Sequence, residues 1–224
     1  MASLVENERL LKEAEGVLNE ALALFNSKEW EHKTNWVVEA TDDETKSTAW
    51  SRRPEDHPNL KQMAMETHVK ISAERLFDRL WNKVGNDVKY NDEIEESKIL
   101  FKVDEHCDVM KQVTAKRFGI SSRESLLVRT WKLEDGVYVL AQKSTELESE
   151  PVKQDLVRMQ IFLSVIRLTP EGPDSAKWES TGMFDIGGKV PKFLLNKLMG
   201  GKRALQRVEK IQQMVERVKS EEPQ

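Results

Sequence analysis

The chain has 224 residues, of which 38% are hydrophobic and 33% charged, so it can build a sizeable core without disulfides or metal ions. This composition excludes a disordered chain, and no apolar stretch approaches the roughly 18 residues that cross a bilayer. The formal net charge of -4 argues against nucleic acid as a partner of the whole surface.

Cysteine usage and targeting signals indicate the compartment. The only cysteine, Cys107, cannot form an internal disulfide or a zinc cluster. The sequence has no basic segment followed by an apolar run and small residues, the pattern of a secretory signal. We therefore expect a cytoplasmic protein without a metal or other cofactor.

The first third of the chain alternates between helices and short strands. Apolar residues at helical spacing predict a helix over about residues 4–27. Between residues 30 and 70, runs rich in Thr, Val and Trp predict three strands separated by turns. Ser72 is the predicted N-cap of a second helix, which should end at Gly85-Asn86.

Six further strands are predicted before a final helix. They cover residues 97–103, 106–115, 124–133, 136–146, 155–168 and 176–186. Asp135-Gly136 marks a hairpin between two of them, and residues 169–174, with two prolines, mark a turn. Pro191 follows Gly187-Gly188 and begins a helix over about residues 190–218.

The order of these elements predicts an α+β fold. Nine strands without crossover helices must pair mostly antiparallel, because parallel pairing needs connections of about a dozen residues or more. We therefore predict one domain over residues 1–224, a curved nine-stranded antiparallel sheet closed by the long C-terminal helix. Since one helix cannot fill the concave face of so large a sheet, a cavity should remain, lined in part by Leu194, Leu198 and Leu205.

Several short segments between about residues 88 and 200 match the motifs of a known family. They are Ser122-Arg123-Glu124, Val128-Arg129, Asp135-Gly136, Val157-Arg158 and above all Asp185 to Lys192, followed by Leu194-Leu195-Asn196. On these residues the chain resembles the START (steroidogenic acute regulatory protein-related lipid transfer) domain family. The resemblance implies a helix-grip fold around a tunnel for one lipid. Members of that family bind sterols, phospholipids, ceramides, bile acids or carotenoids and move them between membranes.

Arg129 is the most informative single residue, because it interrupts the nearly apolar strand from Ser125 to Trp131. Such an arginine either reaches solvent at a sheet edge or is paired in the interior. The resemblance favours a position inside the cavity, opposite a carboxylate of the preceding strand. Here that acidic position falls on Gln112 or Met110, so the sequence does not single out a sterol. Asp108, on the same face of that strand, is then the nearest counter-charge.

The alternation of side chains along these two strands supplies the rest of the predicted lining. The residues that share one face with Asp108 are Met110, Gln112, Leu127, Arg129 and Trp131. An apolar wall with a few polar groups suits a lipid, because apolar burial supplies affinity and a hydrogen bond fixes orientation. Ordinary core packing explains the same pattern, and equally well for Leu127 and Met110.

The final helix is also the predicted gate. Residues 189–218 carry eight basic and two acidic side chains, whereas residues 1–31 have a net charge of -4. A basic amphipathic helix suits an anionic membrane, although a solvated helix face has the same pattern. Glycines weaken a helix interior, which would let a lid swing, although a simple bend explains them too. The predicted gate and membrane contacts are Phe118, Ile120, Lys197, Gly200, Gly201, Lys202 and Arg203.

No motif indicates an enzyme, since the nucleophile elbow, the phosphate-binding loops and the zinc-protease motif are all missing. Glu105 to Asp108 holds nucleophile, base and acid types, but His106 and Cys107 should face opposite sides of a strand. We predict a monomeric, non-enzymatic protein that binds and transfers one lipid, contacts membranes transiently and binds no nucleic acid. The alternatives are a sensor that binds without transfer and a small hydrolase or cyclase on a related fold.

Overall fold

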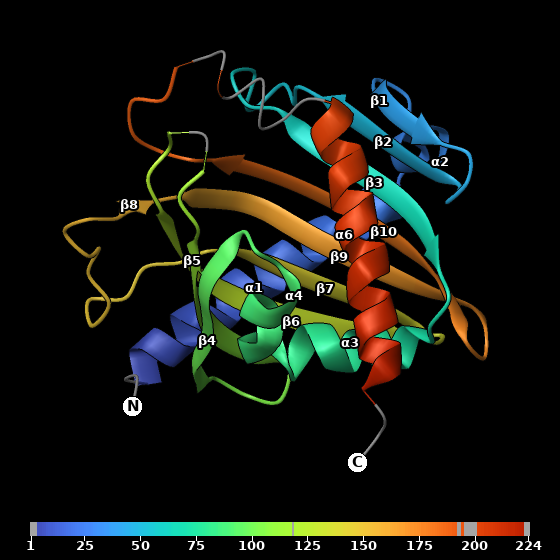
Figure 1. Cartoon of the computed structure of the whole chain (residues 1–224). Coiled ribbons are helices and arrows are strands. Elements are labelled where there is room, and N and C mark those ends of the chain that lie inside the picture. Colours follow the sequence, from blue (N-terminus) through green and yellow to red (C-terminus); the bar gives the residue numbers. More distant parts are fainter. Residues whose placement is uncertain (1–3, 118, 192–193, 195–200, 222–224) are drawn as a thin grey trace.

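The structure, a computed structural model, describes residues 4–117, 119–191, 194 and 201–221 (Figure 1). Its helices are α1 (Leu4–Phe25), α2 (Lys28–His32), α3 (Ala73–Trp81), α4 (Asp87–Tyr90) and α6 (Gly201–Ser220), with a 3-10 turn, η1, at Val84–Asn86. Its strands are β1 (Val37–Asp42), β2 (Ser47–Arg52), β3 (Gln62–Val69), β4 (Ile94–Lys102), β5 (Cys107–Thr114), β6 (Arg123–Glu134), β7 (Val137–Ser144), β8 (Val157–Arg158), β9 (Gln160–Gly172) and β10 (Ser175–Asp185).

The described strands form a single ten-stranded sheet. Nine of them follow the order β1-β2-β3-β10-β9-β7-β6-β5-β4, with antiparallel pairing throughout. This confirms the predicted α+β class with a nine-stranded antiparallel sheet. The tenth strand, β8, pairs in parallel with Arg123 and Glu124 of β6. Sequence reasoning merged β8 and β9 into one strand over 155–168, because no turn residue marks the break at Met159.

Two further boundaries differ from the prediction, namely the turn between β9 and β10 and the end of α3. Strands β9 and β10 extend into the predicted turn, so that only Pro173 and Asp174 separate them. Ser72 is confirmed as an N-cap, since its Oγ accepts a hydrogen bond from the Arg75 backbone N–H at 3.3 Å. The helix that it caps ends at Trp81 rather than at residue 85, and η1 and α4 follow it.

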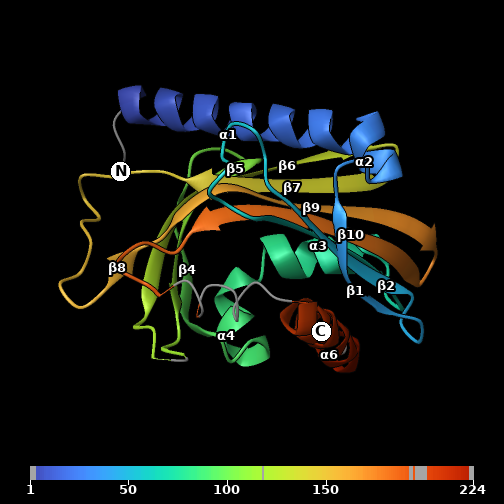
Figure 2. The ribbon, with the colours of Figure 1, turned by 90° about the horizontal axis from the view of Figure 1, so that it is seen from above.

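Helices cover both faces of the curved sheet. Figure 2 shows α1 on one face and α3, α4 and α6 on the concave face. Helix α1 packs against the sheet because its apolar residues recur every three or four positions and form one buried stripe. That stripe comprises Leu10, Ala14, Val17, Ala21 and Phe25. Of the described helices, α3, α4 and α6 are the ones that cover the concave face.

Helix α6 crosses the strands of the concave face (Figure 1). Its residues Met214, Val215 and Val218 are buried in a cluster with Leu76 of α3 and Trp178 of β10. The C-terminal half of α6 is therefore anchored by the hydrophobic core. The described part of its N-terminal half contributes two buried apolar residues, Val208 and Ala204, and Ala204 belongs to a much smaller cluster.

The C-terminal helix begins later than predicted within the described part of the chain. Residues 189–191 are not helical, Leu194 lies in a helical turn, and α6 runs from Gly201. Residues 192–193 and 195–200 lie outside the described residues.

The Asp185–Gly188 segment of the family motif forms a tight turn after β10. Asp185 Oδ1 accepts a hydrogen bond from the Gly187 backbone N–H at 2.9 Å, and Gly187 has a φ of 66°. A Cβ on Gly187 would lie 2.8 Å from the Arg158 carbonyl oxygen, so a side chain there requires the backbone to shift. The glycine is thus required by both its backbone conformation and the close approach of β8.

Candidate functional site

A cavity of about 470 Å³ lies between the concave face of the sheet and α6. Strands β3, β9 and β10 form one wall, and α6 and the segment around α4 form another. Much of the lining is apolar and includes Met65, Leu80, Ile166, Phe184, Ile211 and Met214. Its volume falls in the range of small-molecule sites, roughly 300–1,000 Å³. We call this space the main cavity.

A second space of about 110 Å³, the small cavity, adjoins the main cavity. The two share the lining residues Leu80, Asp87, Gln112, Ser164 and Ile166. Arg129 and Met110 line the small cavity only. Three residues of the sequence-predicted lining, Met110, Gln112 and Arg129, are therefore brought together here.

The structure places Arg129 in the interior and pairs it with Asp108. Arg129 Nε donates to Asp108 Oδ1 at 2.8 Å, and Nη2 donates to Oδ2 at 2.7 Å. Nη1 and Nη2 also donate to the Leu80 and Trp81 carbonyl oxygens, at 3.1 and 3.2 Å. Arg129 is 5% exposed and Asp108 1%, so the reading of an edge arginine with a solvated head does not hold. Four donated bonds leave this guanidinium nearly saturated.

The Arg129–Asp108 pair is electrically neutral and joins the end of α3 to the sheet. The guanidinium also stacks over the Trp81 ring, 4.5 Å from its centroid. A charge that is already compensated attracts a ligand anion weakly. The contacts of Arg129 thus favour a structural role beside the small cavity.

The other predicted lining residues lie apart from both cavities. Leu127 is fully buried and packs with Met110 and Val84 as ordinary core. Trp131 packs on the Phe77 ring, with centroids 4.6 Å apart, and lines neither cavity. Leu194 and Leu205 are partly buried and line neither cavity. Leu198 lies outside the described residues.

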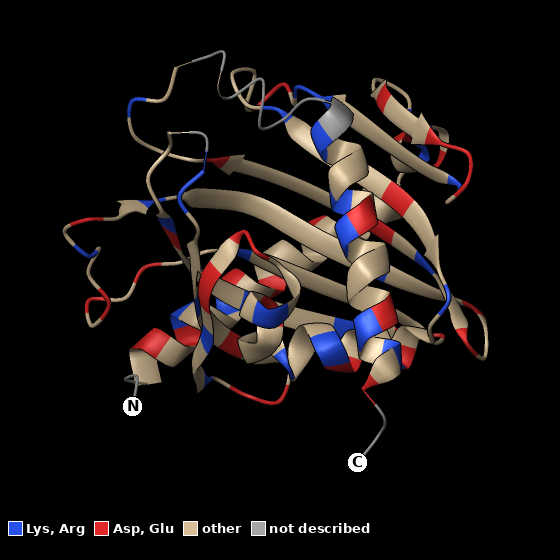
Figure 3. Cartoon of the chain, in the orientation of Figure 1, with Lys and Arg blue, Asp and Glu red and all other residues tan. Residues whose placement is uncertain are grey.

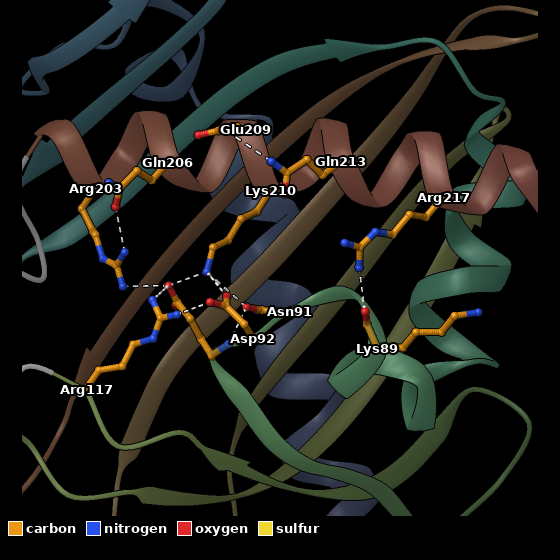
Figure 4. Close-up of polar contacts among 11 residues, drawn as sticks. Lys89, Asn91, Asp92, Arg117, Arg203, Gln206, Glu209, Lys210, Gln213 and Arg217 are labelled. Carbon is orange, nitrogen blue, oxygen red and sulfur yellow. Dashed lines mark hydrogen bonds and ion pairs between the residues drawn. The ribbon is translucent and has the colours of Figure 1, made fainter.

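Five charged residues tie α6 to the rest of the molecule, and Figure 4 shows how they converge. Arg203 Nη2 donates to Glu93 Oε1 at 2.7 Å, and Lys210 Nζ donates to the same oxygen at 2.6 Å. Lys210 also contacts Asp92 Oδ1 at 2.8 Å. Arg117, from the segment before β6, binds both Asp92 and Glu93. We call the set of Asp92, Glu93, Arg117, Arg203 and Lys210 the latch.

The latch lies partly out of water, which strengthens its charge contacts. Burial by itself would raise the pKa of Glu93, but the hydrogen bond and charge of Lys210 outweigh it, aided by Arg203 and Arg117. The net result is a Glu93 pKa below its ordinary value. The carboxylate therefore stays ionised and keeps its three cationic partners at neutral pH.

Lys and Arg recur along α6 (Figure 3), but they do not form one solvated face. Arg203 and Lys210 bind carboxylates of the latch. Ile120 is partly buried, and its backbone forms a two-way bridge with Arg117. Gly201 begins α6 as described. The remaining predicted gate residues, Phe118, Lys197 and Gly200, and the side chain of Lys202 lie outside the described part of the chain.

Sequence reasoning missed Arg207, which lines the main cavity. It counted Arg207 among the basic residues of the helix and assigned it no face. Helical spacing could have located it, because Arg207 falls three positions after Ala204 and four before Ile211, both of which line the main cavity. An arginine within an apolar helix stripe is the signal that was overlooked.

The His106–Cys107 region carries no catalytic arrangement. Cys107 is buried, and its burial, together with Asp104 and Asp108, raises the pKa of its thiol to about 12. His106 packs on the Trp131 ring at the surface.

Within the described ranges, no three His, Cys, Asp or Glu side chains gather as they would around a metal ion. Nor is any helix there long and apolar enough to cross a membrane.

Comparisons with known proteins agree with this geometry. The START domain pattern matches residues 17–221. Steroidogenic acute regulatory-like protein 1 of Caenorhabditis elegans is 21% identical over 193 residues, which cover 85% of this chain and 73% of that protein. The human mitochondrial steroidogenic acute regulatory protein is 22% identical over 193 residues, covering 84% of this chain and 65% of that protein.

The fold is shared with the solved structure of a human protein. Human StAR-related lipid transfer protein 5 superposes with a TM-score of 0.80 at 16% identity, over 94% of this chain and 98% of that one. The likeness includes the large antiparallel sheet closed by a C-terminal helix, which is the helix-grip fold. From the domain match over most of its length, this chain belongs to the START domain family, which implies that it binds lipid.

Proposed function

We propose that this protein binds one hydrophobic lipid per chain in the main cavity and carries it between membranes without covalent chemistry. The observation that carries the proposal is the main cavity, about 470 Å³ and largely apolar, in a member of this family. Burial of the lipid's apolar surface would supply the affinity, about 25 cal/mol per Å² removed from water. The similar human protein named for lipid transfer supports the transfer step.

Helix α6 and the latch would act as the gate. Ala204, Ile211 and Met214 of α6 wall the main cavity, so displacing the helix would open that cavity along its length. Arg203 and Lys210 bind Glu93 and Asp92 in the closed form. Anionic headgroups of a membrane would compete for these same cations, each worth roughly 1 kcal/mol near the surface. A membrane could therefore release the latch on contact.

The proposal also covers how the protein meets its surroundings. The loop around Arg117, with Phe118 and Ile120, would supply apolar contacts to the bilayer beside α6. The protein would work as a cytoplasmic monomer that touches membranes only during transfer and binds no nucleic acid. A single buried thiol suits that reducing compartment.

Vesicle transfer tests this proposal directly. Native mass spectrometry should find one lipid per chain in protein purified from its own cells. Transfer of a fluorescent lipid analogue should speed up with the anionic lipid content of acceptor vesicles and slow as salt screens the surface, over about 8 Å at physiological ionic strength. Bound lipid without transfer would instead indicate a sensor. Turnover of the lipid that depends on Asp108 or His106 would indicate an enzyme.

A further inference from the structure

Arg207 is a cation inside the main cavity without a direct partner. Its side chain lines the cavity from α6, and it forms no hydrogen bond or ion pair with any residue that the structure describes. The other two cations of the lining are paired. Arg79 Nη2 lies 2.8 Å from Asp87 Oδ1, and Lys210 binds Asp92 and Glu93. Among the described charged residues of the lining, Arg207 is therefore the one cation without a hydrogen bond or an ion pair.

The surroundings of Arg207 leave its charge uncompensated. Loss of solvent contact lowers the pKa of Arg207, and the positive charge of Arg203 lowers it further, whereas the negative charge of Glu93 raises it. Glu93 is already committed to Arg117, Arg203 and Lys210 through its Oε1 atom. Arg207 is partly buried, and because a guanidinium stays protonated in proteins, its charge at the cavity wall is open to an anionic group of a ligand.

The charge balance of the main cavity points the same way. Its charged lining comprises three cations and two carboxylates, which leaves a net charge of +1: Arg79, Arg207 and Lys210 against Asp87 and Glu93. The rest of the lining is mainly apolar and is built from the sheet and α6. A ligand that matches this wall has one anionic group and an apolar body.

We infer that the main cavity takes an amphiphile with an anionic headgroup, a carboxylate or a phosphate, and that Arg207 binds this headgroup. The planar guanidinium can present two parallel N–H donors to such an oxyanion. Arg129 is less suited to that role because Asp108 already occupies two of its donors. This inference rests on the proposed function, since it names the class of lipid that the cavity would hold.

Two probes with the same chain and different heads test the inference. Oleate and oleyl alcohol are titrated into native protein, Arg207→Gln and the control Arg217→Gln, at one pH and salt concentration. Arg217 lies on the same helix, is exposed and, among the residues that the structure describes, donates only to the Lys89 carbonyl oxygen, outside both cavities. For each protein, the ratio of the two Kd values is compared, so that the different hydrophobicity of the probes cancels between proteins.

We expect Arg207→Gln to reduce the preference for oleate by about 10-fold or more, the effect of losing a charge-assisted hydrogen bond, and Arg217→Gln to leave it unchanged. Binding of oleyl alcohol should be kept by both variants. Arg207→Lys, which keeps the charge and loses the paired donors, should fall between native protein and Arg207→Gln. It also serves as the test variant if thermal unfolding shows that Arg207→Gln does not fold.

The outcomes separate this inference from the proposed function. If both probes bind and their Kd ratio is the same in native protein and the Arg207 variants, the anionic headgroup is excluded while lipid binding stands. If neither probe binds native protein, both proposals fall. Inorganic phosphate and oleyl phosphate form a further pair, because equal affinity for them would mean a site for free anions rather than for a lipid headgroup.

Discussion

Asp108 of β5 and Arg129 of β6 are direct cross-strand partners that meet through two hydrogen bonds, of 2.8 and 2.7 Å. The same guanidinium donates to the carbonyl oxygens of Leu80 and Trp81, where α3 ends. One arginine thereby holds a helix end, a carboxylate and two strands in a fixed arrangement. The wall of the small cavity depends on that arrangement.

Removing the Arg129 side chain should therefore destabilise the fold strongly. We expect Arg129→Ala to lower the free energy of unfolding by about 3–5 kcal/mol, because it leaves the buried Asp108 carboxylate without its partner. Urea unfolding at pH 7 measures the change, and adding Asp108→Ala should recover part of it. Lys132→Ala is the control, since Lys132 lies on the same strand in an exposed pair with Glu134 and should change stability by less than about 1 kcal/mol. A loss as small as that for Arg129→Ala would contradict the structural role.

Filling the main cavity should block lipid binding without harming the fold. Gly182 of β10 lines this cavity, and a Cβ built there would meet only the Leu163 carbonyl oxygen, at 3.6 Å. We expect Gly182→Phe to weaken binding of a fluorescent lipid analogue by at least about 10-fold, while thermal unfolding shows little change, because strand glycines contribute little packing.

The matched control for the cavity lies on the other face of the sheet. Gly16 of α1 is exposed, and a Cβ there meets nothing within 4 Å. Gly16→Ala should raise stability by up to about 1 kcal/mol through helix propensity and leave lipid binding unchanged. Unimpaired binding by Gly182→Phe would place the lipid elsewhere than in the main cavity.

Weakening the latch should speed transfer. Glu93→Gln removes the charge that binds Arg117, Arg203 and Lys210. The closed form should therefore become less stable relative to the open form by about 1–2 kcal/mol, which raises the ratio of open to closed molecules roughly 5- to 30-fold. Vesicle-to-vesicle transfer should be faster than for native protein, and the ratio of the two rates should approach one as salt is raised. The control Glu209→Gln alters an exposed carboxylate whose one hydrogen bond within the described part of the chain comes from Gln213. Equal rates for all three proteins would show that the latch does not limit opening.

The surroundings of the Glu179 carboxylate indicate that the protein loses stability in acid. It is 3% exposed and accepts hydrogen bonds from Arg167 Nε and Nη2, both at 2.7 Å, and from Trp30 Nε1 at 3.1 Å. Burial would raise the pKa of Glu179, but the hydrogen bonds and charge of Arg167 outweigh it, with Lys177 adding, so the pKa lies below its ordinary value. A carboxyl group whose pKa is lower in the folded state stabilises above its unfolded pKa, and that contribution disappears as pH falls through the folded pKa.

The free energy of unfolding should therefore fall below about pH 4, the region where an unfolded glutamate begins to protonate. Glu179→Gln should be less stable than native protein at pH 7 and lose less between pH 5 and pH 3, which urea unfolding across that range would measure. Glu148→Gln, at an exposed position, should follow the native profile. Parallel profiles for native protein and Glu179→Gln would rule out this carboxylate as the cause.

Residue patterns predicted the parts of the fold that local chemistry controls. Alternation along β5 and β6 placed Asp108 and Arg129 on one face, and the structure pairs them across the two strands. Helical spacing predicted α1 and the buried side of α6, and Ser72 predicted the start of α3. The short strand β8 could not be predicted, because its two residues pair with β6 only after distant segments have come together.

By itself, the sequence determined the α+β class, the antiparallel sheet and the family, because periodicity and motifs record which face of each element is buried. It named Asp108 as the nearest counter-charge of Arg129 but left open whether Arg129 reaches solvent at a sheet edge or is paired in the interior, and the structure pairs the two. Only the tertiary structure decided what surrounds each charge of α6. Arg203 and Lys210 meet carboxylates that lie more than a hundred residues earlier in the chain, whereas Arg207, on the same helix, faces the main cavity. The physical reason is that helical spacing specifies a direction around the helix axis, while the groups found in that direction depend on how separate elements pack.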